Sequence, residues 1–419
     1  MNKVAKFAVA GAMAMVLGNS IAAFADDAAP PPATPKPGVS AAAGKDLQAA
    51  QKALADKNYD VALAALDKVK ANPKKNEYDE FAMNQFYYNA YVAQHKLQEA
   101  EQPLEAWLNS KYITPDLQKK LVVAAAYLNY QLMNYDKALE FGNRAVKEGY
   151  APAQLQQAMA QAYYLKNDYR GTDRFVRAMV DDQVKAGSAP TEDMLKLGLS
   201  SAVKLNDDAA ESRWLEVMVT YHPTSEYWQN LLDSVYRSNS KMTDPQLLQV
   251  YRLSADVGAL KKGSEYAEMA QLALARGSPG EAVAVLNKGF AANAFTEQAD
   301  KNRNTHLLDS AKKQAATDQP TLAKSEAEAA NAPNGDRFVG AGIGYFGYGD
   351  YDKATKDISA GLAKGTVKDP PDARLTLGIA QLKAGNKDEA VKTFKAVKGD
   401  PVDERIAALW ILHARSGQS

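Results

Sequence analysis

A pattern that recurs after 36 residues near the C-terminus limits this chain to a small class of folds. Gly-Asp-Tyr-Asp-Lys-Ala ends at Ala354, and Gly-Asn-Lys-Asp-Glu-Ala ends at Ala390. Counting back from each alanine, a glycine lies twelve residues earlier, at Gly342 and Gly378, and a turn glycine lies five residues earlier. A large apolar residue follows each alanine four positions later and can fill the space between neighbouring helix pairs. This spacing predicts tandem helix-turn-helix repeats.

The same signature can be followed back to the start of the folded sequence near Lys45. Its anchoring small residues stand at positions 62, 100, 138, 172, 210, 282, 354 and 390, at intervals of 38, 38, 34, 38, 72, 72 and 36 residues. Each interval of 72 residues holds one repeat with an eroded signature, at 225–257 and 296–332. The second is polar and alanine-rich, with Pro320 at the expected start of a helix. We therefore predict an all-α fold, an αα-superhelical solenoid of about ten repeats.

The predicted domain organisation has three parts: a signal peptide at 1–25, a linker rich in proline and alanine at 26–43, and the solenoid at 44–419. The linker has too little apolar content to pack. The predicted repeats span residues 45–74, 76–115, 116–150, 151–186, 190–223, 225–257, 262–294, 296–332, 336–369 and 371–401. A helix at 402–415 is expected to cap the final open core.

The N-terminus has the order of features found in secretory signals. Lys3 and Lys6 precede an apolar run at 7–17, and Ala23-Phe24-Ala25 places small residues at the cleavage positions. We predict cleavage after Ala25; the alternative is an uncleaved anchor helix. The chain has no cysteine, which excludes disulfides and the lipidated cysteine of a lipoprotein. A soluble periplasmic protein fits these features.

Charge gives no support for nucleic acid or membrane binding. The chain has 50 basic and 50 acidic residues, and removal of a leader that carries Lys3 and Lys6 leaves a net charge of −2. No strong field of either sign is available to attract nucleic acid or anionic lipid.

No catalytic or metal-binding constellation is recognisable in the sequence. The four histidines, at His95, His222, His306 and His413, fall in different repeats or the cap and match no zinc motif. We expect each to lie on the surface or between helices. Acidic pairs such as Asp207-Asp208 fall in turns, where they cap helices or are solvated. We predict a protein without enzyme activity, cofactor or metal.

Gly342, Gly344 and Gly347 match G-x-G-x-x-G, the fingerprint of dinucleotide-binding folds. That motif needs a strand before it and a helix after it, but no β-branched run precedes Gly342. The repeat places all three glycines inside a helix, where small residues allow close helix contact. A nucleotide site is therefore not predicted.

The repeat resembles the tetratricopeptide repeat. The matching residues are Gly342, Tyr345, Gly349, Ala354 and Ile358 in one repeat, and Leu377, Gly378, Gly385, Ala390, Phe394 and Pro401 in the next. The N-terminal repeats carry Asn, Lys or Met where the family has its turn glycine, and several periods are 38 rather than 34. The resemblance covers about residues 45–397 and implies a helical solenoid that binds protein.

In that family the concave surface is lined by first-helix residues at fixed offsets before the alanine. At these offsets the sequence has Gln85, Asn89, Tyr127, Tyr130, Gln157, Gln161, Tyr164, Asp233, Tyr236 and Gln271. Amides and phenols suit the backbone and prolines of an extended peptide. The alternative is that the tyrosines are core and the glutamines cover an exposed face. The Lys and Asn pairing that clamps a C-terminal carboxylate in some members is missing, which disfavours that narrower function.

A closer resemblance covers nearly the whole mature chain. Tyr88-Asn89-Ala90-Tyr91, Glu105-Ala106-Trp107-Leu108 and Leu286-Asn287-Lys288-Gly289 are similar to periplasmic repeat proteins associated with TonB systems. This implies an accessory, non-enzymatic scaffold beside TonB, ExbB and ExbD, whose partner is a proline-rich TonB-like periplasmic segment or an ExbB/ExbD-type complex. Two alternatives remain open: a generic scaffold for envelope or exopolysaccharide assembly, and an α-superhelical enzyme that acts on cell-wall glycan.

Overall fold

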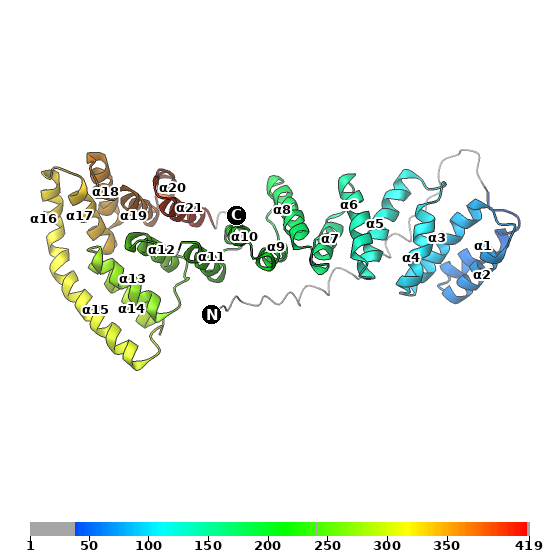
Figure 1. The fold of residues 1–419 in the computed structure, drawn as a ribbon, viewed down its shortest axis with the longest axis horizontal. Coiled ribbons are helices and arrows are strands. Elements are labelled where there is room, and N and C mark those ends of the chain that lie inside the picture. The colour runs from blue at the N-terminus through cyan, green and yellow to red at the C-terminus, as the bar shows by residue number, and fades with distance from the viewer. Residues whose placement is uncertain (1–37, 240, 417–419) are drawn as a thin grey trace. The chain divides into compact units, whose positions relative to one another are not determined.

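The computed structural model describes residues 38–239 and 241–416, and all regular structure in these ranges is helical (Figure 1). The all-α prediction is therefore confirmed. The first helices are α1 (Gly44–Ala55), α2 (Tyr59–Ala71), α3 (Glu77–Ala93), α4 (Leu97–Leu108), α5 (Pro115–Gln131), α6 (Tyr135–Lys147), α7 (Ala153–Leu165), α8 (Tyr169–Lys185), α9 (Glu192–Leu205) and α10 (Asp208–Tyr221). They are followed by α11 (Ser225–Ser238), α12 (Asp244–Asp256), α13 (Gly263–Ala275), α14 (Pro279–Ala291), α15 (Gln298–Asp318), the 3₁₀ helix η3 (Gln319–Thr321), α16 (Leu322–Ala330), α17 (Asp336–Gly347), α18 (Tyr351–Lys364), α19 (Pro370–Lys383), α20 (Lys387–Lys395) and α21 (Pro401–Arg415).

The helices form two compact units, Met1–Asp207 and Asp208–Ser419, which we call the N-terminal unit and the C-terminal unit. The predicted signal peptide and its cleavage site at Ala25 lie outside the described residues, as does most of the predicted linker. In the part of the chain that the structure describes, no helix has the length and apolar character needed to cross a membrane.

The N-terminal unit is a stack of helix pairs. Consecutive helices pack as hairpins, α1 with α2, α3 with α4 and α5 with α6, and first helices also pack on one another, as α5 does on α7 and α7 on α9. Leu104, Leu121, Leu128 and Leu155 lie in the core between successive pairs. This is the stacking expected of a tetratricopeptide-like solenoid. The predicted pair at 190–223 is divided, because α9 ends this unit and α10 begins the next.

The end of the predicted linker is part of the folded structure. The backbone amide of Ser40 donates a 2.9 Å hydrogen bond to Oδ1 of Asp79, and the side chain of Asn72 donates to the carbonyl of Ala42. Ala43 is fully buried. Residues 38–43 therefore pack against α2 and α3, although their composition predicts a spacer.

Most of the described hairpin turns place one residue in the left-handed region of the backbone, near the position where the family has glycine. Glycine fills it in the later repeats, at Gly277, Gly349 and Gly385 (φ 72°, 79° and 84°). Lys57, His95, Met133 and Asn167 adopt the same conformation in the early repeats, with φ from 56° to 64°. Non-glycine residues adopt this conformation at some cost in energy. The turn geometry is thus conserved along the chain while the residue type is not.

The small and large residues of the repeat meet inside each helix pair. A Cβ atom on Gly342 would lie 2.5 Å from Cγ1 of Ile358, and one on Gly378 would lie 2.5 Å from the Phe394 ring. Ile358 also packs in a cluster with Ala373 and Leu377 of the next pair. The large residue therefore fills space within its own repeat as well as between repeats.

The three glycines of the G-x-G-x-x-G match are contact points between helices. Gly342 faces Ile358 on α18, Gly344 faces Leu322 on α16, and Gly347 faces Ser278 at the start of α14. All three lie in α17 with no strand before them. The motif therefore serves helix packing.

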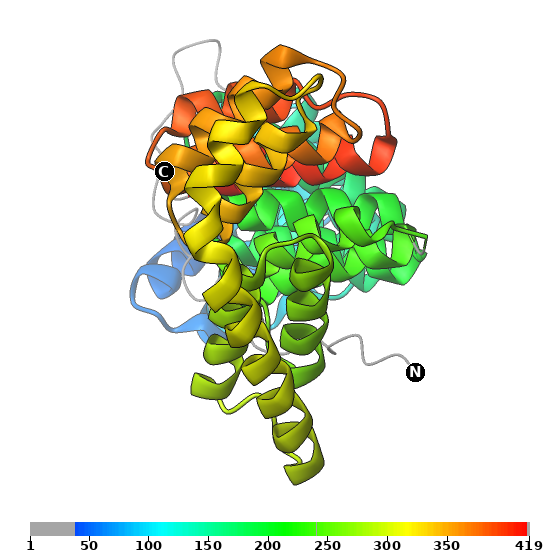
Figure 2. The same cartoon turned by 90° about the vertical axis from the view of Figure 1, so that its left-hand side faces the viewer.

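The eighth predicted repeat is not a helix hairpin. α15, η3 and α16 follow one another as a bent rod, drawn in yellow in Figure 2, because the residues at the joints keep helical backbone angles. α15 packs on α14, and α16 packs on α17. The segment buries few large side chains, mainly Leu308 and Leu322, so its two helices cannot share a core of their own.

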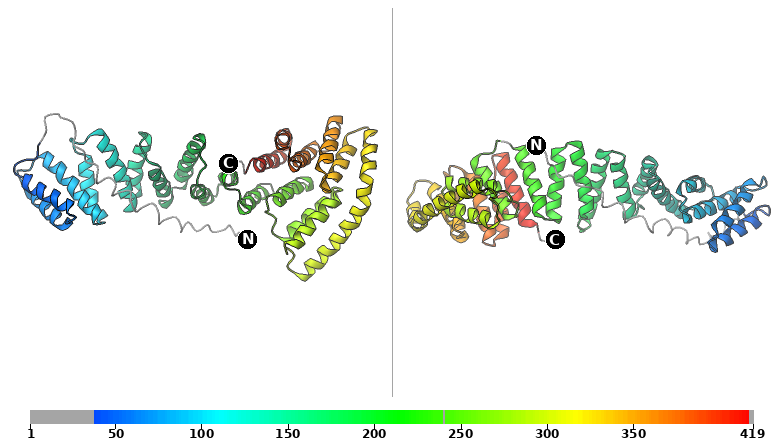
Figure 3. Two further views of the ribbon diagram at one scale, coloured as in Figure 1. Left: turned by 180° about the vertical axis from the view of Figure 1, so that it is seen from behind. Right: turned by 90° about the horizontal axis from the view of Figure 1, so that it is seen from below.

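The predicted solenoid of about ten helix pairs with a C-terminal helix fits the observed helices, but the stack turns back on itself within the C-terminal unit. After the bent rod the chain doubles back, so that α17 packs on α14, α19 packs on α12, and α21 packs on α10 and α12 (Figure 3). Arg405 on α21 pairs with Glu216 and donates to Ser212 on α10. The last helix therefore closes the final pair, where Trp410 stacks on Phe394 of α20, and it also covers the first helices of its own unit.

We predict that Gly342→Ala lowers the free energy of unfolding by about 1 to 3 kcal/mol, because the added methyl overlaps Ile358 and the backbone of α18. Urea denaturation followed by circular dichroism measures the change. Gly340→Ala is the matched control on the same helix, since nothing lies within 4 Å of its Cβ position. The control should be neutral or stabilising by up to about 1 kcal/mol. Equal effects of the two variants would contradict the proposed helix contact.

Candidate functional site

The predicted groove residues of the N-terminal unit lie on three successive first helices. Gln85 and Asn89 are partly exposed on α3, Tyr130 on α5, and Gln157, Gln161 and Tyr164 on α7. Tyr127 is different, because it is only 4% exposed and belongs to the core cluster. The expectation that Tyr127 lines a groove is therefore corrected. Burial raises its pKa to about 12.

A hydrogen bond joins the polar residues of neighbouring repeats. The Tyr130 hydroxyl donates to Oε1 of Gln161 at 2.6 Å, which links α5 to α7. Because Oε1 accepts this bond, the Gln161 amide nitrogen is turned away from Tyr130 and offers its two donors elsewhere. Burial raises the pKa of Tyr130, so the phenol stays protonated and keeps donating at neutral pH. We call Tyr130, Gln157, Gln161 and Tyr164 the tyrosine–amide strip.

Aromatic contacts fix the ends of this strip. Tyr164 meets Tyr169 edge-on with ring centroids 5.2 Å apart, and Tyr130 lies against Tyr135 at 6.1 Å. Lys166, which follows the last residue of α7, pairs with Asp136 on α6. The strip thus presents aromatic rings and amides held in place by their neighbours.

The remaining predicted groove residues lie in the C-terminal unit. Asp233 and Tyr236 are on α11, where they line a small pocket, whereas Gln271 is exposed on α13 and does not line it. These residues and the tyrosine–amide strip belong to different units.

The histidines form no group with one another. His95 occupies a hairpin turn, and His413 on α21 contacts Asp256 on α12 at 2.8 Å. Among the described residues, no cluster of three or more His, Cys, Asp or Glu side chains has the arrangement of a metal site.

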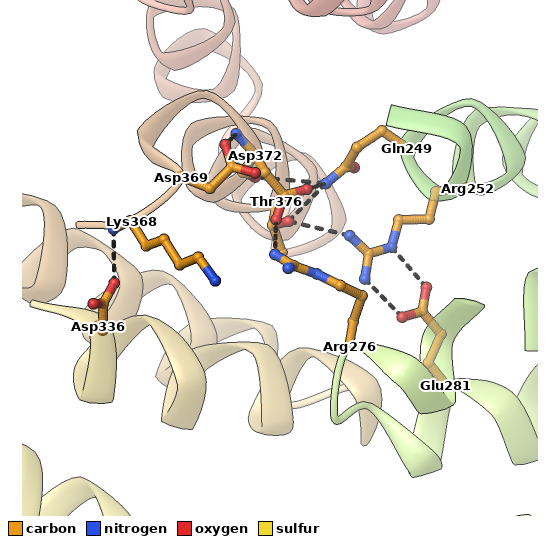
Figure 4. Close-up of polar contacts among 9 residues, drawn as sticks. All are labelled: Gln249, Arg252, Arg276, Glu281, Asp336, Lys368, Asp369, Asp372 and Thr376. Atoms are coloured by element: carbon orange, nitrogen blue, oxygen red, sulfur yellow. Dashed lines mark hydrogen bonds and ion pairs between the residues drawn. The ribbon is translucent and has the colours of Figure 1, made fainter. Parts of the chain in front are cut away.

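A buried polar network that the sequence pattern did not reveal lies where the C-terminal unit doubles back (Figure 4). Arg252 on α12 donates two 2.7 Å hydrogen bonds to the carboxylate of Glu281 on α14. It also donates to the Thr376 hydroxyl on α19 at 3.1 Å and stacks 4.7 Å from the Phe346 ring centre on α17. Arg252 and Glu281 are both buried. Burial alone would lower the pKa of Arg252. The charge and hydrogen bonds of Glu281 outweigh this effect and raise the pKa, so the guanidinium stays charged.

The same network continues along α19. Gln249 on α12 donates to Asp372 at 2.7 Å and to Thr376 at 2.9 Å, and Arg276 pairs with Asp372 from the end of α13. Gln249 and Thr376 are completely buried. The two partners of each of these contacts are more than 90 positions apart in the chain, so their types, but not their proximity, can be read from the sequence.

Asp357 is a buried carboxyl without a neutralising partner. It is 0% exposed on α18, and in the described structure neither of its oxygens has a hydrogen-bond partner. Burial, followed by the nearby charge of Glu326, raises its pKa to about 6, while Lys356 and Lys353 act in the opposite sense.

Comparisons with known proteins do not identify a family for this chain. No family model matches the chain, and no curated protein sequence matches it. The solved structure of Naa15/Naa10 bound to HypK-THB is 15% identical over 89% of this chain with a TM-score of 0.35, and the chain spans 63% of the matched chain's length. A tetratricopeptide repeat protein from Parabacteroides merdae is 13% identical over 79% of this chain and 98% of its own, with a TM-score of 0.27. Yeast Tom70 is 11% identical over 90% of this chain and 96% of its own, with a TM-score of 0.24. The assignment of the repeat therefore depends on the helix pairs and turns described above.

We predict that Arg252→Met lowers the free energy of unfolding of the C-terminal unit by about 3 to 5 kcal/mol, because Glu281 is left buried and unpaired. The double variant Arg252→Met, Glu281→Met should recover much of that loss, since two apolar side chains then replace the ion pair. Chemical denaturation of the three proteins measures the coupling. A double variant less stable than Arg252→Met would contradict the proposed role of the pair.

We also predict a pH effect from Asp357. Its folded pKa of about 6 exceeds its ordinary value of 3.8, so the folded state binds this proton more tightly than the unfolded state. The stabilisation that this gives is complete below the unfolded pKa and is lost as pH rises through about 6. Asp357→Asn should therefore gain about 1 to 3 kcal/mol relative to the wild type between about pH 4 and pH 7.5.

Denaturation curves at both pH values measure this gain. Asp352→Asn, at an exposed carboxyl on the same helix, is the control and should show the same difference from wild type at both. A constant difference for Asp357→Asn as well would show that its carboxyl does not titrate in this range.

Proposed function

We propose that this chain is a non-enzymatic protein–protein interaction scaffold of the periplasm, accessory to a TonB-type outer-membrane transport system. Its partner is a proline-rich, extended periplasmic segment, which binds on the tyrosine–amide strip of the N-terminal unit. The observation that carries the proposal is the Tyr130–Gln161 hydrogen bond, which holds a ring and an amide from successive repeats side by side.

The strip is chemically complementary to a polyproline-like segment. Such a segment has no internal hydrogen bonds, so its backbone carbonyls are free to accept. The amide nitrogens of Gln157 and Gln161 can donate to these carbonyls, and the partly exposed rings of Tyr130 and Tyr164 offer flat surfaces to the prolines. None of the four side chains is charged, so the interaction needs no ion pair.

The transport assignment is supported by the sequence resemblance to TonB-associated repeat proteins, and the location is supported by the signal-like residues 1–25. Cell fractionation tests the location: the mature chain should be released with the periplasmic contents.

We predict that a proline-rich TonB-type segment binds with an affinity on the order of micromolar, with little dependence on salt. Replacing Tyr130 and Tyr164 by Ala together should weaken binding at least about tenfold, a loss of roughly 1.4 kcal/mol, because both stacking surfaces are removed. Titration calorimetry at low and high salt measures both effects.

Two controls accompany this titration. Tyr59→Ala removes a partly exposed tyrosine on α2, outside the strip, and should bind like the wild type. Circular dichroism shows whether each variant keeps its helical content. No binding by the wild type removes the TonB-type partner, whereas binding that survives the double substitution moves the site away from the strip.

A further inference from the structure

A small pocket in the C-terminal unit opens between α11, α12 and α13. Its volume is about 200 Å³, and it is lined by Gln229, Leu232, Asp233, Tyr236, Tyr251, Ser254, Ala259, Leu260 and Glu265. Whole small-molecule ligands generally occupy cavities of roughly 300 to 1,000 Å³. This pocket is therefore of a size for a single side chain rather than for a metabolite.

Two carboxylates contribute to the polar lining of the pocket. Asp233 on α11 and Glu265 on α13 line it, and Glu268 lies next to it, where it accepts a 2.6 Å hydrogen bond from the Tyr251 hydroxyl. Partial loss of hydration raises the pKa of Asp233, against the opposing effects of Lys262 and Arg237. Among the described residues, Asp233 makes no ion pair, which leaves its charge available to a ligand.

Of the two nearby cations, one is directed to an acid outside the pocket and the other lies beside Glu265, whose Oε2 also accepts the backbone amides of Lys261 and Lys262. Arg237 pairs with Glu211 on α10 at 2.6 Å, and Lys262, which is largely exposed, lies 3.4 Å from Glu265. Neither cation lines the pocket. Asp233 is therefore the lining carboxylate that has no cation paired with it among the described residues.

The pocket also contains a buried hydroxyl, that of Tyr236, which lies beside Ser254. The Tyr236 hydroxyl oxygen is buried and has no hydrogen-bond partner in the described structure. Burial raises the pKa of Tyr236, and the nearby Ser254, which is 5% exposed, only partly opposes this. An unsatisfied buried hydroxyl costs free energy, and a donor brought by a ligand would recover it.

We infer that this pocket binds the side chain of a lysine from a partner protein. Leu232, Ala259 and Leu260 can cover the aliphatic stem, as apolar surfaces do for buried lysine stems. The ammonium supplies three donors, which match the carboxylates of Asp233 and Glu265 and the oxygen of Tyr236. Tyr251 and Tyr236 add aromatic rings that attract a cation.

Other occupants fit less well. An anion would meet two carboxylates, and an apolar side chain would leave the Tyr236 hydroxyl and Asp233 unsatisfied. A guanidinium is a larger, planar group that favours paired acceptors in a fork, whereas an ammonium is compact. This site lies in the other unit from the tyrosine–amide strip, so it does not rest on the function proposed for that strip.

The test uses the full mature chain and two short capped peptides, Ac-Ala-Lys-Ala-NH₂ and the same peptide with norleucine in place of lysine. Saturation-transfer NMR titration at low salt should show at least about tenfold weaker binding of the norleucine peptide, because it has no charge for the carboxylates. Equal binding of the two peptides would overturn the inference.

Substitutions then locate the site. Asp233→Asn should weaken binding of the lysine peptide about fivefold or more, since an ion pair in a partly dehydrated site is lost. Asp309→Asn, which removes an exposed acid on α15 and changes the net charge equally, should have no effect. If both substitutions weaken binding of the lysine peptide equally, the binding reflects general charge attraction, and the assignment to this pocket is overturned.

Tyr236→Phe separates a binding role from a structural one. If the hydroxyl accepts from the ammonium, its removal weakens lysine-peptide binding a few-fold, about the effect of one hydrogen bond, without destabilising the fold. Unchanged affinity would remove Tyr236 from the site. The Tyr130→Ala, Tyr164→Ala double variant should bind the lysine peptide like the wild type, so failure of either proposal can be recognised separately.

Discussion

The guanidinium of Arg252 joins four helices of the C-terminal unit. It stands on α12, forms a paired hydrogen bond with Glu281 on α14, reaches Thr376 on α19 and covers the Phe346 ring on α17. A buried cation is stable only when its partners are in place, so these helices must assemble together. The doubled-back arrangement is therefore an all-or-none feature of this unit. The pocket depends on it indirectly, because Tyr251 faces the pocket from the helix that Arg252 anchors.

The N-terminal unit is held together differently. Its helix pairs contact mainly the pairs next to them, and the contacts recur because each hairpin turns at the same point. A left-handed residue closes every early turn, even where Lys57 or Met133 must adopt this conformation. Regular turns place equivalent side chains of successive repeats at equivalent positions, which is why Tyr130 and Gln161 meet. Substitutions within one repeat can therefore change one part of the tyrosine–amide strip while the neighbouring repeats keep their side chains in place.

These two kinds of contact explain what the sequence could predict. The turns and the contacts of Gly342 and Gly378 follow from geometry within one repeat, so the 36-residue period was enough to place them. The polar partners of Arg252 could not be predicted, because Thr376 is 124 residues away and a Gln or Arg in an eroded repeat looks like a solvated residue. The repeat register places Tyr127 in the groove, because the register gives the face of a helix but not how deeply neighbouring helices cover it. The pocket is predictable only in part. The repeat register identifies Asp233 and Tyr236 as groove residues, but it does not identify Glu265, which comes from the next helix pair.

The contact between α21 and α10 sets an order of events during synthesis. Arg405 meets Ser212 across 193 residues of chain, whereas the N-terminal pairs touch near neighbours in sequence. Local contacts form quickly, and contacts between distant residues must wait for loop closure. The N-terminal unit can therefore assemble pair by pair as it emerges, since domains fold as units in the order of synthesis. The C-terminal unit stays incomplete until its last helix has been made, so a chain that ends before Pro401 leaves α10 and α12 uncovered.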